Sequence, residues 1–283
     1  LGGWRLTPAR TTFRPMPSGP EIVVRPDGRI DVLRAAPARE RWSWSLYDFA
    51  NTIFSMNIVT LYFSVWIAND LGAGTTPYAL ASSISSVLVA VSIPVLGLVS
   101  DARRRRKPWV VGFTLLCVAA TALLAVVGQR GGLVPLLLIF VVANYAYQGA
   151  LPFYNAMMTE LVPADQQGRL SGYGTAIGYV GSIVGMLLIV PFVAGATPFG
   201  PVSPSVMAVL HRIPFTASGG RAATFVPTAL AFLLFSVPLF IWCRDHVPVA
   251  RERWQRLSLA QPFRELVRSV ADSRRHPGLL RFI

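Results

Sequence analysis

The sequence WVVGFTLLCVAATALLAVVG occupies residues 109–128 and contains no charged side chain. A helix of about 20 residues rises about 30 Å, which matches the hydrocarbon thickness of a bilayer. Inside lipid, only a helix can satisfy all its backbone polar groups within one segment. This run therefore predicts a transmembrane helix.

Five further apolar runs of similar length flank this one. Four of them are uncharged and cover approximately residues 78–99, 133–158, 170–194 and 222–242. The remaining run, at about residues 43–68, comes first in the chain and is interrupted only by Asp48 near its start. The six runs predict an all-α, polytopic membrane protein with six transmembrane helices.

Composition agrees with this fold class. Hydrophobic residues make up 53% of the chain, charged residues only 14%, and the mean hydropathy is +0.51. Soluble domains carry about 25% charged residues. The formal net charge of +13 raises the question of a nucleic-acid partner. Because the basic residues cluster between apolar runs, without interleaved stacking aromatics, we expect no nucleic acid and assign this charge to the membrane surface.

Residue types that bind metals or catalyse reactions do not form recognisable motifs here. Cys117 and Cys243 lie in or at the end of apolar runs, and the histidines at positions 211, 246 and 276 are scattered, which does not fit a zinc site. We find no HExxH, no Gly-x-Ser-x-Gly and no phosphate-cradling loop. The sequence thus predicts no catalytic residue, cofactor or metal, and it disfavours a membrane-embedded enzyme.

Lys and Arg are distributed unequally between the two sides of the predicted bundle. Of the 26 such residues, only Arg130, Arg212 and Arg221 fall on one side. The positive-inside rule then places both ends of this chain in the cytoplasm. We expect a multi-pass protein of the cell membrane.

The predicted organisation has four parts. Residues 1–40 are rich in Arg and Pro and are expected to be a disordered basic cytoplasmic tail. Residues 41–243 are the six-helix transmembrane domain, with a short interfacial helix expected at residues 205–210. Residues 244–276 are interpreted as a cytoplasmic amphipathic linker, and residues 277–283 as the start of a seventh helix.

Asp48 is the leading functional candidate, because an ionisable group within a membrane costs several kcal/mol to bury. With Tyr47 beside it and Asn51 one helical turn later, Asp48 could face a central cavity and take up a proton or bind a substrate amine. The alternative is that Asp48, only a few residues into its run, is hydrated at the interface or anchors the helix end.

The fourth and fifth runs carry two other patterns. Asn144, Gln148 and Asn155 of the fourth run are candidates for lining a cavity, and interhelical hydrogen bonding is their alternative role. The fifth run presents glycines that allow a second helix to approach closely, and we expect them to serve helix packing. These are Gly172, Gly174, Gly178, Gly181 and Gly185.

The connection between the second and third runs reads GLVSDARRRRKP at residues 97–108. A topology signal explains the arginines but not Asp101, which can pair with a neighbouring Arg and clamp helices together in one conformation. We therefore predict a cytoplasmic gating motif of Gly97, Asp101, Arg103, Arg105 and Arg106. A similar spacing of Glu160, Asp165 and Arg169 indicates either a second pairing site or a solvated turn.

The loop at residues 97–108 resembles the signature of the major facilitator superfamily. The segments SWSLYDFAN at 43–51, YNA at 154–156 and GRLSGYG at 168–174 are similar to its vacuole-effluxer-like branch, which includes the fungal vacuolar amino-acid effluxer. The resemblance implies twelve helices in two halves, each half a pair of three-helix inverted repeats, with the substrate site between the halves. This chain would be the N-terminal half, its partner the missing C-terminal half, and Asp48 and Asn51 family-motif positions.

Two classes of function remain after these observations. The favoured hypothesis is a secondary active transporter of small solutes, by family analogy an amino-acid effluxer, which works by alternating access with proton coupling. Substrate or proton contacts are assigned to Tyr47, Asp48, Asn51, Asn144, Gln148 and Asn155. The alternatives are a transporter of a different solute, such as a sugar or drug, and a non-transporting membrane scaffold or receptor.

Overall fold

The computed structural model describes residues 20–24, 30–103, 105–129 and 132–246. Within these ranges, six helices are long and apolar enough to cross a membrane, which confirms the predicted spans. They are Ala38–Asp70, Thr76–Asp101, Lys107–Gly128, Leu133–Leu161, Ala164–Ala194 and Arg221–Trp242. Each helix includes or closely matches its apolar run and often extends past it, because charged helix ends can lie in the polar interface.

The first span is not a uniform α-helix. It consists of α1 (Ala38–Phe54), a π-helical stretch (Ser55–Tyr62), α2 (Phe63–Val65) and a second π-helical stretch (Trp66–Asp70). The side chain of Asn57 donates to the carbonyl of Ile53 at 3.0 Å, beside the first change of geometry. The apolar run gave no indication of π-helix, since hydropathy does not distinguish it from α-helix.

The other spans are α-helices, and all but the last two are joined by short connections. They are α3 (Thr76–Arg103), α4 (Lys107–Gly128), α5 (Leu133–Leu161), α6 (Ala164–Ala194) and α8 (Phe225–Trp242), the last preceded by a 3-10 turn at Arg221–Thr224. The long connection after α6 contains α7 (Pro204–Leu210) and the small hairpin of β3 (Ala196–Thr197) and β4 (Gly200–Pro201). The expected short helix at residues 205–210 is therefore confirmed.

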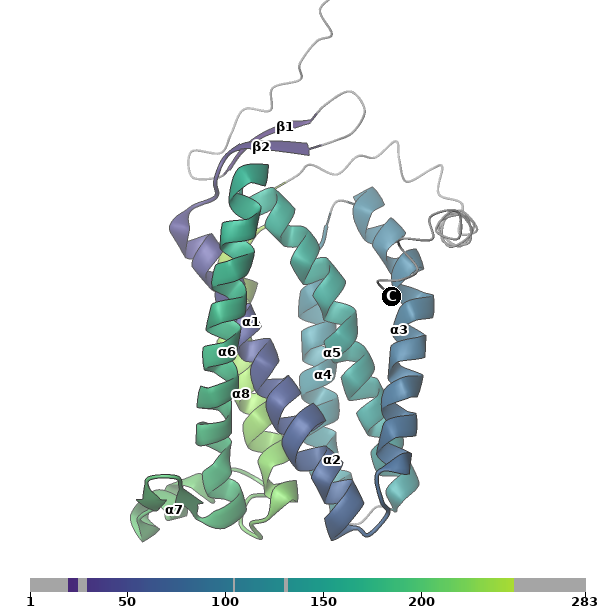
Figure 1. The fold of residues 1–283 in the computed structure, drawn as a ribbon, viewed down its shortest axis with the longest axis vertical. Helices are drawn as coiled ribbons and strands as arrows, with labels where there is room; N and C mark the ends of the chain where they lie inside the picture. The colour runs from purple at the N-terminus through teal and green to yellow at the C-terminus, as the bar shows by residue number, and fades with distance from the viewer. Residues whose placement is uncertain (1–19, 25–29, 104, 130–131, 247–283) are drawn as a thin grey trace, which may run out of the picture.

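Helices α1 and α5 make the main contacts of the bundle. Helix α1 packs against α6 and α8, and α5 packs against α4 and α3. Helix α4 also contacts α8. In Figure 1 the helices α6, α1, α5 and α3 lie side by side toward the viewer, with α8 and α4 behind them. Of the most apolar window of each span, 56% is buried in the first but only 6% in α3. Helix α3 therefore stands at an edge. Its main neighbour among the described elements is α5, and Tyr78 near its start also donates to the carbonyl of Val59 in the first span.

The pattern of neighbours has an internal symmetry. Exchanging the first three spans for the last three converts the α1–α6 pair into the α5–α3 pair, and the α1–α8 pair into the α5–α4 pair. The α4–α8 pair is converted into itself. This relation is what two three-helix repeats produce, as expected for half of a twelve-helix transporter fold.

Aromatic residues fill the interior between α1, α5 and α8. Tyr47, Phe54 and Phe232 are fully buried. Farther along the first span, the ring of Phe63 stacks on that of Phe140, with 4.5 Å between centroids. Because helices in lipid gain no hydrophobic advantage from associating, such shape-matched contacts carry much of the packing energy.

The expected unstructured tail contains a hairpin in its described part. Strands β1 (Glu21–Val24) and β2 (Ile30–Arg34) pair antiparallel, and α1 already begins at Ala38. Ile22 of β1 and Val32 of β2 are buried, whereas Glu21 and Leu33 beside them are exposed. This alternation of buried and exposed residues, typical of a strand with one covered face, outweighs the Arg-rich and Pro-rich composition of the segment. The remainder of the predicted tail, nearly all of the linker and the start of the seventh helix lie outside the described residues.

Candidate functional site

Asp48 lies well inside the first span. It follows the start of α1 by ten residues, which corresponds to about 15 Å along the helix axis. Its carboxylate is partly exposed and lies over Gly178 of α6, where an added Cβ would be 3.0 Å from Oδ2. Within the described ranges the carboxylate has no hydrogen bond or ion pair.

The neighbours of Asp48 on α1 define the direction in which it points. One turn earlier, the ring of Trp44 stacks on Tyr154 of α5 at 4.5 Å. One turn later, the hydroxyl of Thr52 donates to the carbonyl of Gly178 at 2.8 Å. Since residues four apart share a helix face, Asp48 lies at the seam between α5 and α6, the two helices on either side of α1 in Figure 1.

The other two candidates on α1 differ in their surroundings. Asn51 is buried, and its Oδ1 has no hydrogen-bond partner among the described residues. Tyr47 is turned away from the seam, because its hydroxyl lies 2.7 Å from the hydroxyl of Thr114 on α4. Thr114 already donates to Val110, so Tyr47 is the donor in this pair. The structure therefore does not bring Tyr47 to the same face as Asp48.

Asn144, Gln148 and Asn155 form one stripe along α5, since their spacings of four and seven residues place them on one face. Next to this stripe, Tyr147 contacts Phe54 of α1 on one side, and Tyr145 donates to Ser92 of α3 on the other. The stripe thus lies on the face of α5 between its contacts with α1 and α3. This face belongs to the side of the bundle formed by α6, α1, α5 and α3 (Figure 1), which we call the open side.

The members of this stripe have different partners. Gln148 accepts a hydrogen bond of 3.2 Å from Ser86 of α3, as expected for interhelical bonding. Asn144 is buried, and its Nδ2 finds no partner in the described part of the chain, whereas Asn155 is exposed. A buried polar atom without a partner costs about 1–3 kcal/mol. Asn51 and Asn144 therefore offer two such atoms that a bound solute or water would satisfy.

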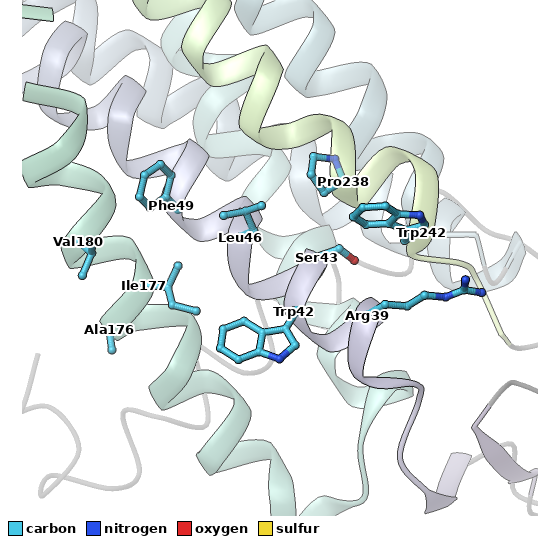
Figure 2. Close-up of a pocket in the computed structure, with 10 residues that line it drawn as sticks. All are labelled: Arg39, Trp42, Ser43, Leu46, Phe49, Ala176, Ile177, Val180, Pro238 and Trp242. Atoms are coloured by element: carbon cyan, nitrogen blue, oxygen red, sulfur yellow. The ribbon is translucent and has the colours of Figure 1, made fainter. Parts of the chain in front are cut away.

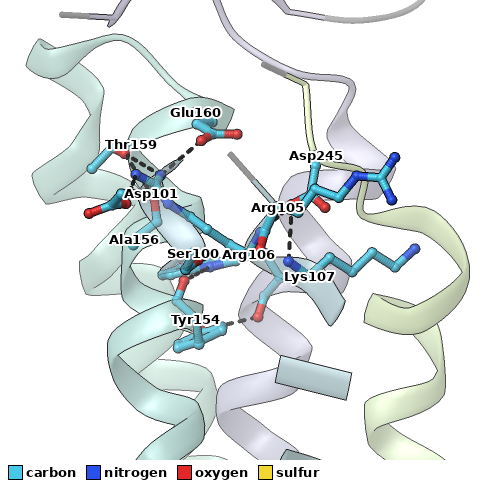
Figure 3. A network of polar contacts seen from close by, with 11 residues as sticks. Ser100, Asp101, Arg105, Arg106, Lys107, Tyr154, Ala156, Thr159, Glu160 and Asp245 are labelled. Carbon is cyan, nitrogen blue, oxygen red and sulfur yellow. Dashed lines mark hydrogen bonds and ion pairs between the residues drawn. The ribbon is translucent and has the colours of Figure 1, made fainter. Parts of the chain in front are cut away.

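The predicted gating motif is built around Arg106 (Figure 3). Its guanidinium lies 2.9 Å from the carboxylate of Glu160 and 3.3 Å from that of Asp101. It also donates to the carbonyl of Ala156 at 2.6 Å and lies 3.3 Å from the hydroxyl of Thr159. One arginine thus links the end of α3 and the start of α4 to the last turns of α5.

Glu160 also belongs to this cluster, although its spacing in the sequence did not connect it with Arg106. Glu160 is buried and pairs with Arg106, whereas Arg169 contacts the hydroxyl of Tyr173 at 3.1–3.2 Å. The signal in the sequence was an acidic residue directly after an apolar run, but the arginine that pairs with it lies 54 positions away. No sequence spacing connects the two.

The remaining motif positions have structural contacts of a different kind. Gly97 has open space where a side chain would lie, and Arg103 ends α3. The backbone of Arg105 exchanges two hydrogen bonds of 3.3 Å with Ser100, one to the serine carbonyl and one from its hydroxyl. The structure thus places the guanidinium of Arg106, rather than that of Arg105, at the centre of the motif.

The chain after α8 is fixed to the same end of the bundle. The carboxylate of Asp245 accepts hydrogen bonds from the backbone N–H groups of Arg106 and Lys107, at 2.9 and 3.0 Å, at the start of α4. His246 Nε2 lies 2.7 Å from the buried carboxylate of Glu40. Acidic side chains commonly stabilise a helix start in this way, because its N–H groups lack partners within the helix.

The described residues include no group of three or more His, Cys, Asp or Glu side chains that could hold a metal ion. What the site offers is one carboxylate without an ionic partner, amide groups on a shared open face, and a charged cluster at one end. This arrangement can bind a polar solute and exchange a proton.

Comparison with known proteins gives a consistent family. The model of the Major Facilitator Superfamily matches residues 45–275. An "Uncharacterized MFS-type transporter YxiO" of Bacillus subtilis (strain 168) is 29% identical over 204 residues, covering 70% of this chain and 45% of that protein. An "Uncharacterized protein" of Aquifex aeolicus (strain VF5) is 27% identical over 148 residues, which cover 52% of this chain and 37% of the length of that protein.

The chain spans less than half the length of these curated relatives. No solved structure matches significantly.

Proposed function

The chain belongs to the Major Facilitator Superfamily, a family of transporters rather than of enzymes, and we propose that it forms the first half of a secondary active transporter. In this proposal a small solute crosses the bilayer by alternating access, between this six-helix unit and a second half of the same protein. The aligned relatives are more than twice as long as their matched regions, which supports a second half.

The observation that carries the proposal is the position of Asp48. A carboxylate within a membrane-spanning helix, ten residues after the start of α1 and without an ionic partner in the described residues, is costly unless it serves a proton or a solute. It shares the open side of the bundle with Asn144, Gln148 and Asn155. A titrating carboxylate on that side would couple solute movement to a proton gradient.

The open side also supports the position of the second half. Helices α3 and α6 bound this side and expose large apolar side chains, among them Ile84 and Val87 of α3 and Tyr179 of α6. A second six-helix half would cover this side and enclose Asp48 and the α5 stripe between the two halves. Arg106, Asp101 and Glu160 would then act as a clamp at one mouth of the pathway.

The finer assignment is to an amino-acid effluxer of the vacuole-effluxer-like branch. It rests on the motif that contains Asp48 and Asn51, and on the segments at 154–156 and 168–174. The unequal distribution of Lys and Arg supports a cytoplasmic N-terminus in the cell membrane. Both assignments follow from sequence patterns and are open to direct measurement.

The test uses the full-length protein in proteoliposomes with an imposed pH gradient. We expect saturable uptake of at least one labelled amino acid, and we expect Asp48→Asn to abolish its dependence on the gradient. Asp165→Asn is the matched control, because Asp165 is exposed in the first turn of α6, before the apolar run of that helix begins. This variant should retain wild-type flux.

The outcomes separate the hypotheses. Normal gradient-driven flux in Asp48→Asn would remove the coupling role of this carboxylate. Flux of sugars or drugs without flux of any amino acid would overturn the effluxer assignment but retain the transporter. A correctly inserted protein that moves no solute from any of these classes would instead favour a scaffold or receptor.

A further inference from the structure

A groove runs along the side of α1 that faces away from Asp48. It lies between α1, α6 and α8 and has a volume of about 530 Å³. Figure 2 shows its lining residues, with Arg39 and Trp242 toward one end and Phe49 and Val180 toward the other. On α1 the lining includes Trp42, Leu46 and Phe49, which share one helix face because their spacings are four and three residues.

The length of the groove matches one leaflet of a bilayer. From Arg39 to Phe49, α1 rises about 15 Å, which is half of a hydrocarbon core of about 30 Å. The walls are apolar along this length, apart from the hydroxyl of Ser43. That hydroxyl already contacts the carbonyl of Glu40 and the thiol of Cys243. The groove therefore suits a hydrocarbon chain that enters from the lipid.

The mouth of the groove carries a positive charge. Arg39 is exposed, and its guanidinium has no ion pair within the described residues. The acidic residue next to Arg39 on α1 is Glu40, and its carboxylate already contacts His246. After α8, the carboxylate of Asp245 already accepts hydrogen bonds from the backbone N–H groups at the start of α4.

Two tryptophans mark the same level. Trp42 is 64% exposed and Trp242 is 46% exposed, and both line the groove near Arg39. Exposed tryptophans in membrane proteins concentrate at the depth of the lipid headgroups, where one part of the ring is apolar and the N–H meets water. Arg39 is thus placed at headgroup depth, with an apolar channel leading from it toward the bilayer centre.

We propose that this groove binds one anionic phospholipid. One acyl chain lies along Leu46, Ile177 and Val180, and the phosphate pairs with Arg39. Basic side chains beside gaps between transmembrane helices are suited to bind anionic headgroups, and each contributes measurably to affinity. A zwitterionic lipid gains less from Arg39, because it brings its own positive charge to the mouth of the groove.

This site is separate from the proposed solute pathway. The groove lies between α6 and α8, whereas Asp48 lies at the seam between α5 and α6. Loss of transport in an Asp48 variant therefore gives no information about lipid binding, and the reverse also holds. The two proposals can fail independently.

The test measures retained lipids by native mass spectrometry. The full-length protein in detergent is exposed to an equimolar mixture of phosphatidylglycerol and phosphatidylcholine with identical acyl chains. We expect the wild type to prefer phosphatidylglycerol by roughly fivefold, as for one basic contact at a membrane surface. Arg39→Gln should bring the ratio of the two lipids close to one, and Arg39→Lys should restore most of the preference.

Two further variants separate the groove from general charge. Arg34→Gln removes the same charge from β2, away from the groove, and should leave the preference unchanged. Ala176→Trp fills the groove from the exposed face of α6 and should lower retention of both lipids. Melting temperatures near that of the wild type would show that these variants fold.

Several results would overturn the proposal. These are no preference in the wild type, an equal loss in Arg34→Gln and Arg39→Gln, and unchanged lipid retention in a folded Ala176→Trp. Inorganic phosphate is the last probe. If it raised the melting temperature through Arg39 as much as phosphatidylglycerol does, the ligand would be a free anion instead of a lipid.

Discussion

The contact between α1 and α6 makes a sharp prediction at Gly181. A Cβ at this position would lie 2.6 Å from the carbonyl oxygen of Phe49, 2.7 Å from its Cα and 2.8 Å from Oγ1 of Thr52. Real Cβ atoms essentially never approach other atoms this closely. Because two of these three atoms belong to the backbone of α1, no side-chain rotation can relieve the contact, and Gly181→Ala must separate the two helices.

The expected change in the free energy of unfolding of Gly181→Ala has three contributions. Adding a methyl group to a well-packed contact costs about 1–3 kcal/mol. Separation would also lengthen the hydrogen bond from Thr52 to the Gly178 carbonyl, now 2.8 Å, which is worth about 1 kcal/mol. Replacing Gly by Ala within a helix returns up to about 1 kcal/mol. We expect Gly181→Ala to lower the free energy of unfolding by roughly 1–3 kcal/mol in total.

Gly172→Ala is the matched control, because it makes the same chemical change in the same helix. No atom lies within 4 Å of a Cβ at Gly172. Only the gain in helix propensity remains, so this variant should be neutral or more stable by up to about 1 kcal/mol. The two substitutions are thus expected to change stability in opposite directions.

The measurement is the unfolding of both variants in mixed micelles, followed by circular dichroism under conditions where the transition is reversible. If Gly181→Ala were as stable as Gly172→Ala, α1 and α6 would not be in contact as described. The arrangement of Asp48 over Gly178 would then have to be rejected as well, because the same helix contact positions it.

Two hydrogen-bonded pairs give further predictions. Tyr47→Phe should cost only about 0.5–1.5 kcal/mol, because Thr114 keeps its own bond, whereas Thr114→Val should cost more by leaving the buried Tyr47 hydroxyl unpaired. Melting temperatures of both variants test this order. At the charged cluster, Glu160→Gln should destabilise by about 1–3 kcal/mol. Asp101→Asn should cost at most about 1 kcal/mol, since the Asp101 side chain is 65% exposed and the Glu160 side chain only 5%. Equal effects of these last two variants in chemical or thermal unfolding would contradict the assignment of Glu160 as the main partner of Arg106.

The spans and the glycine surface could be predicted because each depends on local composition. The limits of α4 follow from a run without charges, and the structure extends it by only two residues, to Lys107. The glycine spacing also carried direct information. Gly174, Gly178, Gly181 and Gly185 pack against Trp44, Asp48, Phe49 and Ile53 in that order, as expected for a packing surface. For Gly172, the first of the five predicted glycines, the prediction was wrong, because it is exposed and a Cβ there would have no atom within 4 Å.

Other features depend on contacts that local composition does not encode. The hairpin of β1 and β2 lies in a segment whose Arg and Pro content predicted disorder, yet the backbone N–H of Ala36 that follows it donates to the carbonyl of Leu161 at 2.7 Å. The pairing of Glu160 with Arg106 likewise joins residues from different helices. Such partners become visible only when the helices have been placed.

The candidate site was likewise predictable only in part, because its residue types are local features and its grouping is not. The types and spacing of Asp48, Asn144 and Gln148 identified them, since polar groups in apolar runs are costly. Their grouping on one open side could not be derived from those spacings, because it depends on how α1 and α5 are rotated against each other. The structure fixes that rotation at Trp44 and Tyr154.

Trp44 and Tyr154 form a reciprocal contact between α1 and α5. The indole N–H of Trp44 donates to the carbonyl of Tyr154 at 3.0 Å, and the hydroxyl of Tyr154 donates to the carbonyl of Trp44 at 3.1 Å, while their rings stack. Two opposed hydrogen bonds resist both sliding and rotation. The contact of α1 with α6 is different, because it consists of a smooth glycine surface and the single bond from Thr52. Asp48 lies between these two contacts, one held by several directional bonds and one by shape. Any rearrangement of α6 against α1 would therefore change the surroundings of Asp48 while leaving its relation to α5 intact.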